Sequence, residues 1–222
     1  MIKMVVFDMA GTTVDEDNVV YKTLQKAINE AGVDVSFEEV LLHGAGKEKE
    51  KAIKDILLSV GVVNSQVTSN AFEYFLTHLQ LAYTTLAIKP QPGANEVFKS
   101  LKNKGLFVVL NTGYNLETAQ SLIQKLGWQI GKDFDALITA SDVPNNRPMP
   151  DMIHLAMKQF GIIDGAEVAK VGDSAIDIEE GKNAGCRITI GITTGAHTMA
   201  QLQAANPNFI VNSLEEILPL IA

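Results

Sequence analysis

Several polar side chains of this 222-residue sequence stand just after short apolar runs. Asp8 follows KMVVF, Thr112 lies in LNTGY, Arg147 lies in a later loop, and Asp173 and Asp177 follow KVG. In open parallel sheets, ligands collect beyond the carboxyl ends of the strands, so these side chains would share one edge. Taken singly, each has an ordinary alternative: a helix cap for Asp8 or Asp173, a turn for Thr112, a solvated charge for Arg147. Together they suit the transfer of a phosphoryl group.

Phosphoryl transfer asks a protein mainly for positioning and for neutralisation of negative charge. A carboxylate such as Asp8 can attack an anionic phosphate once their repulsion is relieved, and Mg²⁺ together with Arg147 would relieve it. Mg²⁺ prefers hard oxygen ligands and keeps several waters, so two carboxylates and a backbone carbonyl would suffice. The loop Ala10–Thr13 contains a glycine, and it leaves backbone amides free to point at phosphate oxygens.

The elements that must position these residues are short buried strands separated by helical stretches. The apolar runs are continuous rather than alternating, which favours a parallel sheet with helices on both faces, an α/β Rossmann-like core. The expected strands are Lys3–Phe7, Leu106–Leu110, Ala136–Ile138, Val168–Val171, Ile188–Ile192 and Phe209–Val211.

Residues 17–88 interrupt this rhythm and contain no convincing buried strand. Apolar residues at three-to-four spacing instead predict helices, at Tyr21–Glu30, Glu48–Leu57 and Ala71–Tyr83. The segment begins near Val14–Glu16 and ends near Ile88–Gly93, where KPQPG is typical of a connection. We therefore expect a core domain of residues 1–15 and 89–222, with a small all-helical domain of residues 16–88 inserted after the first strand.

Composition excludes several classes of protein. The chain is 46% hydrophobic and 20% charged, as in ordinary globular proteins. A net charge of −8 argues against nucleic acid or an anionic membrane as the main partner. No apolar run approaches a membrane span, and MIKMVVFD does not resemble a signal peptide, so a cytoplasmic location is expected. The single Cys186 cannot form an internal disulfide. The sequence leaves open whether the chain forms a homodimer.

The motifs DMAGTTVD, LNTGY, RPMPD and VGDSAID, in this order, resemble those of the haloacid dehalogenase superfamily across the whole core. The resemblance implies that Asp8 is the nucleophile and that Thr112 and Arg147 hold phosphate oxygens. It also implies that Asp173, supported by Asp177, helps to bind Mg²⁺.

The same resemblance completes the expected ligand sets. The implied metal ligands are Asp8, the Ala10 carbonyl, Asp173 and Asp177. Gly11, Thr12 and Gly113 are the implied substrate-binding residues.

The first motif departs from most phosphatases of the superfamily, because Ala10 stands where they carry a second aspartate that acts as a general acid. General acid–base assistance contributes about 10²–10⁴ in rate, so hydrolysis of ordinary phosphate esters should be poor unless another acid replaces it. Alanine here and arginine in RPMPD resemble the phosphonatase branch of the superfamily. That branch uses a cap lysine after a glycine to form a Schiff base, and Lys47 in HGAGK occupies the matching position.

This chemistry would explain the alanine. A protonated imine on Lys47 accepts the electrons of a breaking carbon–phosphorus bond while Asp8 captures the phosphoryl group. Phosphonoacetaldehyde or a similar 2-oxoalkylphosphonate is then the expected substrate. KEKEK around Lys47 also fits a plain surface helix, and His43 and Glu50 stand where the branch carries Met and His. TTGAH, which contains His197, resembles the branch as well.

Three rivals remain. A phosphomonoesterase of the same fold would need a cap residue or a water in place of the missing acid. A dehalogenase fits poorly, because those enzymes use no Mg²⁺ and GDSAID keeps the metal-binding acids. A non-catalytic phosphate-binding protein fits poorly as well, because the whole catalytic set is present.

Overall fold

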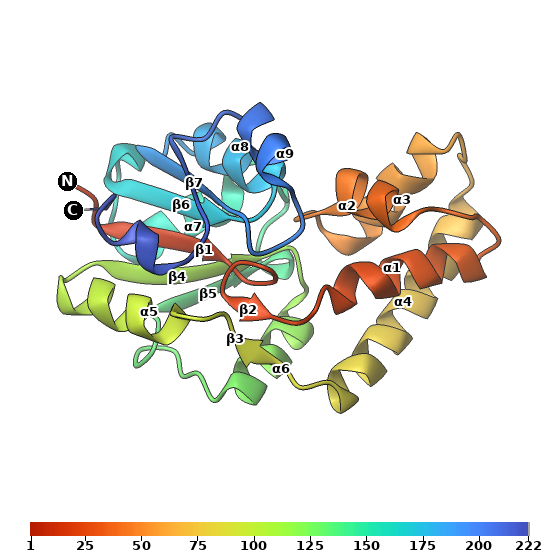
Figure 1. Ribbon diagram of the computed structural model, residues 1–222, viewed down its shortest axis with the longest axis horizontal. Coiled ribbons are helices and arrows are strands. Elements are labelled where there is room, and N and C mark those ends of the chain that lie inside the picture. Colours follow the sequence, from red (N-terminus) through yellow and green to blue (C-terminus); the bar gives the residue numbers. More distant parts are fainter. Residues whose placement is uncertain (222) are drawn as a thin grey trace.

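The computed structural model describes residues 1–221 and contains a six-stranded parallel sheet in the order β5-β4-β1-β6-β7-β8 (Figure 1). All six predicted strands are present, with ends shifted by a residue or two. Their bounds are β1 Met4–Asp8, β4 Phe107–Thr112, β5 Ala136–Thr139, β6 Val168–Gly172, β7 Ile188–Ile192 and β8 Phe209–Val211.

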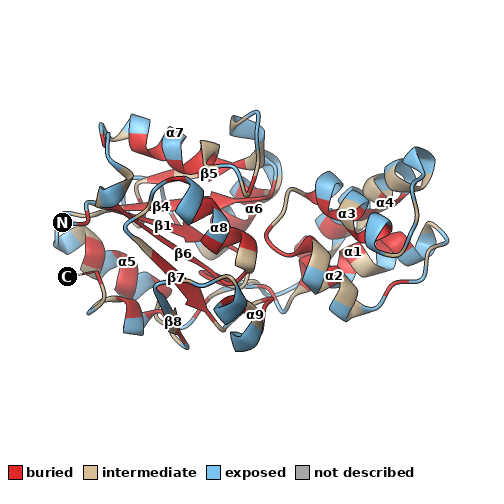
Figure 2. Ribbon diagram, turned by 90° about the horizontal axis from the view of Figure 1, so that it is seen from above, coloured by how far each residue is buried: buried red, intermediate tan, exposed pale blue. Residues whose placement is uncertain are grey.

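Both faces of the sheet are buried, which explains why its strands read as continuous apolar runs. Along β1, Val5 and Phe7 pack into one hydrophobic cluster, whereas Met4 and Val6 pack into another. Helices α5 and α7 cover opposite faces (Figure 2). The helices of the core are α5 Ala94–Asn103, α6 Leu116–Leu126, α7 Asp151–Gln159, α8 Ala175–Asn183 and α9 Met199–Ala204, with short 3₁₀ turns at Ala140–Asp142, Gly165–Glu167 and Glu215–Ile217.

Four of the five helices between β1 and β4 lie in a separate lobe beside the sheet (Figure 1), and we call this lobe the cap. They are α1 Val19–Glu30, α2 Phe37–Gly44, α3 Lys49–Ser59 and α4 Ser65–Thr85. Three were predicted, and α2 was missed because it is short. Ser36 and Glu39 form a capping box at its start, a local signal that would have found it. The predicted division into domains at residues 15 and 88 stays a prediction.

A second, two-stranded sheet joins the cap to the core. β2 Val14–Asp15 pairs antiparallel with β3 Lys89–Pro90, and the Gln91 amide donates to the Thr13 carbonyl at 2.9 Å. Strands of two residues carry no periodicity, so this pair of strands was not predicted. It holds the two connections of the cap side by side.

The strands of the large sheet run toward the cap (Figure 1). Asp8 pairs in register with Asn111, and Thr112 pairs with Thr139, so the polar residues at the strand ends face the cap together. Among residues 1–221, no helix combines the length and the apolar character needed to cross a bilayer.

Candidate active site

Arg147 holds the centre of the site. Its guanidinium is almost completely buried, and Nη1 lies 2.7 Å from Oδ1 of Asp8. The same group lies 3.1 Å from Oδ1 of Asp177, and Nε donates to Glu180 at 2.9 Å. A buried charge is tolerated only when it is paired and hydrogen-bonded, and here several carboxylates do both. The structure thus brings Asp8 and Arg147 together, as the sequence predicted.

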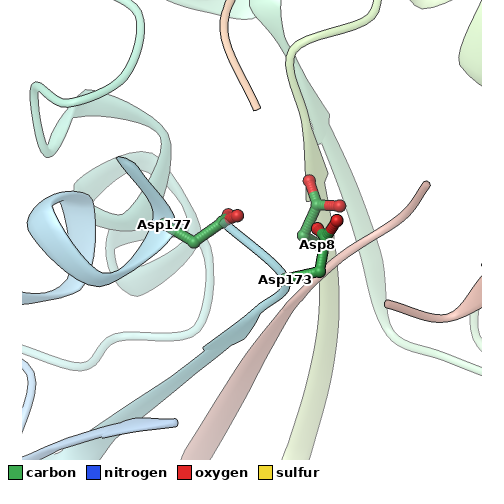
Figure 3. A group of neighbouring side chains, drawn as sticks. All are labelled: Asp8, Asp173 and Asp177. Carbon is green, nitrogen blue, oxygen red and sulfur yellow. The ribbon is translucent and has the colours of Figure 1, made fainter. Parts of the chain in front are cut away.

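Three buried carboxyl groups surround one point at the carboxyl edge of the sheet. Asp8, Asp173 and Asp177 each offer an oxygen within 4.8 Å of the others (Figure 3). Burial and the nearby negative charges raise the pKa of Asp8 and raise that of Asp173 well above its ordinary value. Burial opposes ionisation of Asp177 as well, but Arg147 and Lys170 hold its pKa below the ordinary value. These three carboxyl groups form a candidate site for a metal ion, next to the cationic side chains of Arg147 and Lys170.

The donor set fits Mg²⁺, which takes hard oxygen ligands. Two hydrogen bonds hold the Asp173 carboxylate in place: the Thr12 hydroxyl donates to Oδ1 at 3.2 Å and the Ala196 amide donates to Oδ2 at 2.6 Å. Oδ1 of Asp177 is paired with two cations, Nη1 of Arg147 at 3.1 Å and Nζ of Lys170 at 2.9 Å, so part of its charge is already neutralised. Ala10, whose carbonyl was predicted as a ligand, is buried in the loop after β1.

A buried polar network beneath these groups was not predicted. Lys170, inside β6, lies 2.9 Å from Oδ1 of Asp177 and donates to the Asn111 side chain at 2.7 Å. Asn111 also accepts from Arg147 at 2.6 Å and donates to Glu180 at 2.9 Å. Because these groups orient Arg147 and Asp177, they set the geometry of the site. A lysine within an otherwise apolar strand was the available signal.

Two glycines bring backbone segments unusually close to the site. Gly11 has φ +82°, and a Cβ there would lie 2.6 Å from Oδ2 of Asp173. A Cβ on Gly113 would lie 2.6 Å from the carbonyl oxygen of Lys47, in the cap. The buried Thr112 hydroxyl accepts from the Tyr114 amide at 3.2 Å. Gly11 and Thr12 thus lie against Asp173, and Gly113 lies against the cap; the substrate contacts of Gly11, Thr12, Thr112 and Gly113 stay a prediction.

The loop between α2 and α3 docks the cap onto the site. Its Gly46 carbonyl accepts from Nη1 of Arg147 at 3.3 Å, and the Gly46 amide donates to the Tyr21 hydroxyl at 3.1 Å. A Cβ on Gly46 would lie 2.5 Å from Oγ of Ser174. The loop therefore presses on the core residues next to Asp173.

The two lysines of this loop and helix α3 are placed very differently. Nζ of Lys47 pairs with Asp55 of α3 at 2.6 Å, on a partly exposed surface. Lys49 is 7% exposed; its Nζ donates to the Lys47 carbonyl at 2.6 Å and lies 5.1 Å from the ring centroid of Tyr114. Burial lowers the pKa of Lys49 to about 8. Lys49, which KEKEK had suggested was solvated, is the buried amine of the cap.

The remaining residues singled out by sequence lie at the rim. Glu50 is exposed on α3, and His43 is half-buried near the end of α2. His197 is buried; Nδ1 accepts from the Ala175 amide at 3.0 Å, and Nε2 lies 3.2 Å from the Leu41 carbonyl of α2. These contacts make His197 a link between the core and the cap.

The site combines a buried aspartate, an arginine and an acidic cluster at the edge of a parallel sheet, under a helical cap. This combination is typical of a class of phosphoryl-transfer enzymes. Comparison with known proteins agrees with that class. A family model for haloacid dehalogenase-like hydrolases matches residues 2–185. The chain belongs to this family and is a hydrolase of the phosphatase and phosphonatase type.

The likeness to individual relatives and to solved structures extends over nearly the whole chain. It is 30% identical to the probable phosphatase IndB of Dickeya dadantii over 98% of its length and 92% of that protein. It is 29% identical to phosphonoacetaldehyde hydrolase of Latilactobacillus sakei over 91% of its length and 80% of that protein. A phosphonoacetaldehyde hydrolase-like protein from Oleispira antarctica shares the fold with a TM-score of 0.83 at 20% identity, covering 99% of this chain and 91% of that one.

Proposed function

We propose that this chain is a Mg²⁺-dependent hydrolase that cleaves the carbon–phosphorus bond of phosphonoacetaldehyde or a close 2-oxoalkylphosphonate. The observation that carries the proposal is a buried cap amine, Lys49, whose pKa responds to the charge of the buried carboxylate of Asp8, with alanine at position 10. The relatives named phosphonoacetaldehyde hydrolase support it.

Asp8 is the proposed nucleophile, and its attack on phosphorus forms an aspartyl-phosphate. Arg147, 2.7 Å from Asp8, neutralises charge on the carboxylate and on the phosphoryl oxygens. Mg²⁺ held by Asp8, the Ala10 carbonyl, Asp173 and Asp177 would neutralise further charge when bound. The Thr112 hydroxyl and the amides of the Gly11 loop would hold phosphoryl oxygens.

We propose that Lys49 forms the imine, in place of the Lys47 predicted from the sequence. The Lys47 amine is engaged by Asp55 outside the site, whereas Lys49 is buried against Tyr114. A neutral amine attacks a carbonyl, and an amine with a pKa of about 8 supplies far more of that form near neutrality than an exposed lysine. The imine then accepts the electron pair of the breaking carbon–phosphorus bond, so the leaving carbon needs no acid at position 10.

A second function, hydrolysis of a small phosphate ester, has one specific observation in its favour. The relative that matches 98% of the chain is named a probable phosphatase rather than a phosphonatase. In that case, the cationic form of Lys49 would pair with an anionic group of the leaving alcohol. An acid other than residue 10 would then have to protonate the leaving oxygen.

The two functions are separated by measuring phosphate release from phosphonoacetaldehyde and from a panel of small phosphate monoesters, each with Mg²⁺. We expect kcat/KM for the phosphonate to exceed that for the best ester by about 10²-fold or more, the factor that general acid catalysis contributes. A preference of that size for an ester would overturn the proposal in favour of the second function.

A further inference from the structure

A buried carboxyl group, Glu16, lies where the cap joins the core. It directly follows β2 and is 5% exposed. Its Oε2 accepts a short hydrogen bond from the hydroxyl of Tyr83, on cap helix α4, and a second one at 3.2 Å from Tyr114, after core strand β4. The two phenol oxygens are 2.7 Å apart. Three segments distant in sequence therefore meet at one ionisable group that phosphoryl transfer at Asp8 does not use.

This cluster adjoins the buried amine of the cap. Nζ of Lys49 lies 5.1 Å from the centroid of the Tyr114 ring whose hydroxyl binds Glu16. Lys49 and Tyr114 also line a small cavity of about 50 Å³ between cap and core, together with Phe72, Phe75 and Gly113. Gly113 follows Thr112, so the cavity adjoins the phosphoryl-binding loop. The cavity walls are mostly apolar, which strengthens electrostatic coupling between the groups around the cavity.

The charges that face Lys49 come from both parts of the molecule. Burial lowers its pKa to about 8 and Arg147 acts in the same direction, whereas Asp8, Glu48 and Glu16 act to raise it. Burial likewise raises the pKa of Glu16 to about 7, against the hydrogen bonds from the two phenols and from the Val20 amide and the charge of Lys49. Each of the two groups shifts the pKa of the other, so the ionisation of Glu16 and that of Lys49 are linked.

We propose that Glu16, clamped by Tyr83 and Tyr114, is a positioning residue that sets the charge of the Lys49 amine in the closed enzyme. The inference rests on the proposed function in one respect, that Lys49 meets the leaving group. Tyr83 and Lys49 belong to the cap and Tyr114 to the core, so the cluster is complete only when the two parts are docked. When the two parts are docked, ionised Glu16 opposes the neutral amine that attacks the carbonyl and favours the positive charge of the protonated imine that the cleavage step needs.

The test follows Lys49 directly by NMR, in protein labelled with ¹³C at the ε carbon of lysine. The ¹³Cε shift reports deprotonation, and the Lys49 resonance is identified by its loss in Lys49→Arg. In the unaltered enzyme we expect a midpoint near pH 8 with a smaller step near pH 7 from Glu16. Glu16→Gln keeps the shape but removes the charge, so the midpoint should fall by about half a pH unit or more and the step should vanish.

Two further variants keep the test decisive. Tyr83→Phe removes a donor that stabilises ionised Glu16, so the smaller step should move to higher pH. Glu117→Gln, at an exposed acid in the first turn of α6, is the matched control and should leave the Lys49 curve unchanged because solvent screens that charge.

An unshifted Lys49 midpoint in folded Glu16→Gln would overturn the inference, as would titration of Lys49 near the ordinary value of about 10.4. The measurement uses no substrate. A failed phosphonate assay with a shifted midpoint would therefore count against the proposed function alone.

Discussion

Asp8 ends β1 with Arg147 on one carboxylate oxygen and with Asp173 and Asp177 close by. We expect Asp8→Asn to abolish phosphate release, because an amide keeps the shape but cannot act as a nucleophile. The fold should persist, since the substitution also relieves repulsion among the three acids. Phosphate assays together with thermal unfolding check both expectations. If Asp8→Asn released phosphate at more than about 1% of the rate of the unaltered enzyme, Asp8 would not be the nucleophile.

The proposed mechanism predicts different results for substitutions of Lys49 and of Lys47, although the two residues are close in sequence. Borohydride added with phosphonoacetaldehyde should trap a covalent adduct on Lys49, located by mass spectrometry of the digested protein. Lys49→Arg keeps the positive charge but cannot form an imine at neutral pH, so it should eliminate trapping and carbon–phosphorus cleavage. Lys47→Arg should preserve both, because the Lys47 amine is paired with Asp55 outside the site and arginine keeps that charge. An adduct on Lys47 would restore the prediction made from the sequence.

At the scale of elements, the α2–α3 loop decides whether the cap seats on the core. We expect Gly46→Ala to reduce kcat/KM by 10-fold or more, because its Cβ would meet Oγ of Ser174 at 2.5 Å. A displacement of about 1 Å near reacting groups can cost roughly 10²-fold in rate.

Gly61→Ala is the matched control for this substitution. Gly61 also has a positive φ, +79°, but a Cβ there meets nothing within 4 Å. Both variants should lose about 1 kcal/mol of stability from backbone strain, and only Gly46→Ala should lose activity. Equal activity in the two variants, measured at a temperature where both are folded, would show that cap docking tolerates the added methyl group.

For the whole molecule, the acidic cluster links metal binding to stability. Three buried carboxylates repel one another, so Mg²⁺ should bind the folded chain more tightly than the unfolded one and raise Tm. At a concentration 100 times Kd, the expected gain is about 2.7 kcal/mol. Thermal unfolding with and without Mg²⁺ measures it, and Asp173→Asn should reduce the gain. Full activity in excess chelator, with an unchanged Tm, would contradict the proposed metal requirement.

Local pattern was enough for the sheet and for the chemistry at its edge. Runs such as MVVF and VAKVG are buried on both faces, so they read as strands without knowledge of their partners. Because parallel strands end at a common edge, Asp8, Thr112 and Asp173 had to lie near one another. The motif resemblance placed Arg147 with them, and the structure agrees. Three short elements were not predicted: the two-residue strands β2 and β3 and the helix α2. An element this short shows no periodic pattern of apolar residues.

Tertiary structure alone decided which charged side chains are buried. In KEKEK, Lys47, Lys49 and Lys51 are alike in sequence, and only the docking of α3 against Tyr114 turns Lys49 inward while Lys47 and Lys51 pair with Asp55. Glu16 looked like part of a linker, yet Tyr83 and Tyr114 enclose it from segments far away in the chain. Burial and electrostatic coupling depend on distances between residues remote in sequence. The amino-acid sequence therefore determined the family and the class of hydrolase, whereas the packing of the cap on the core decided which lysine of the cap is buried.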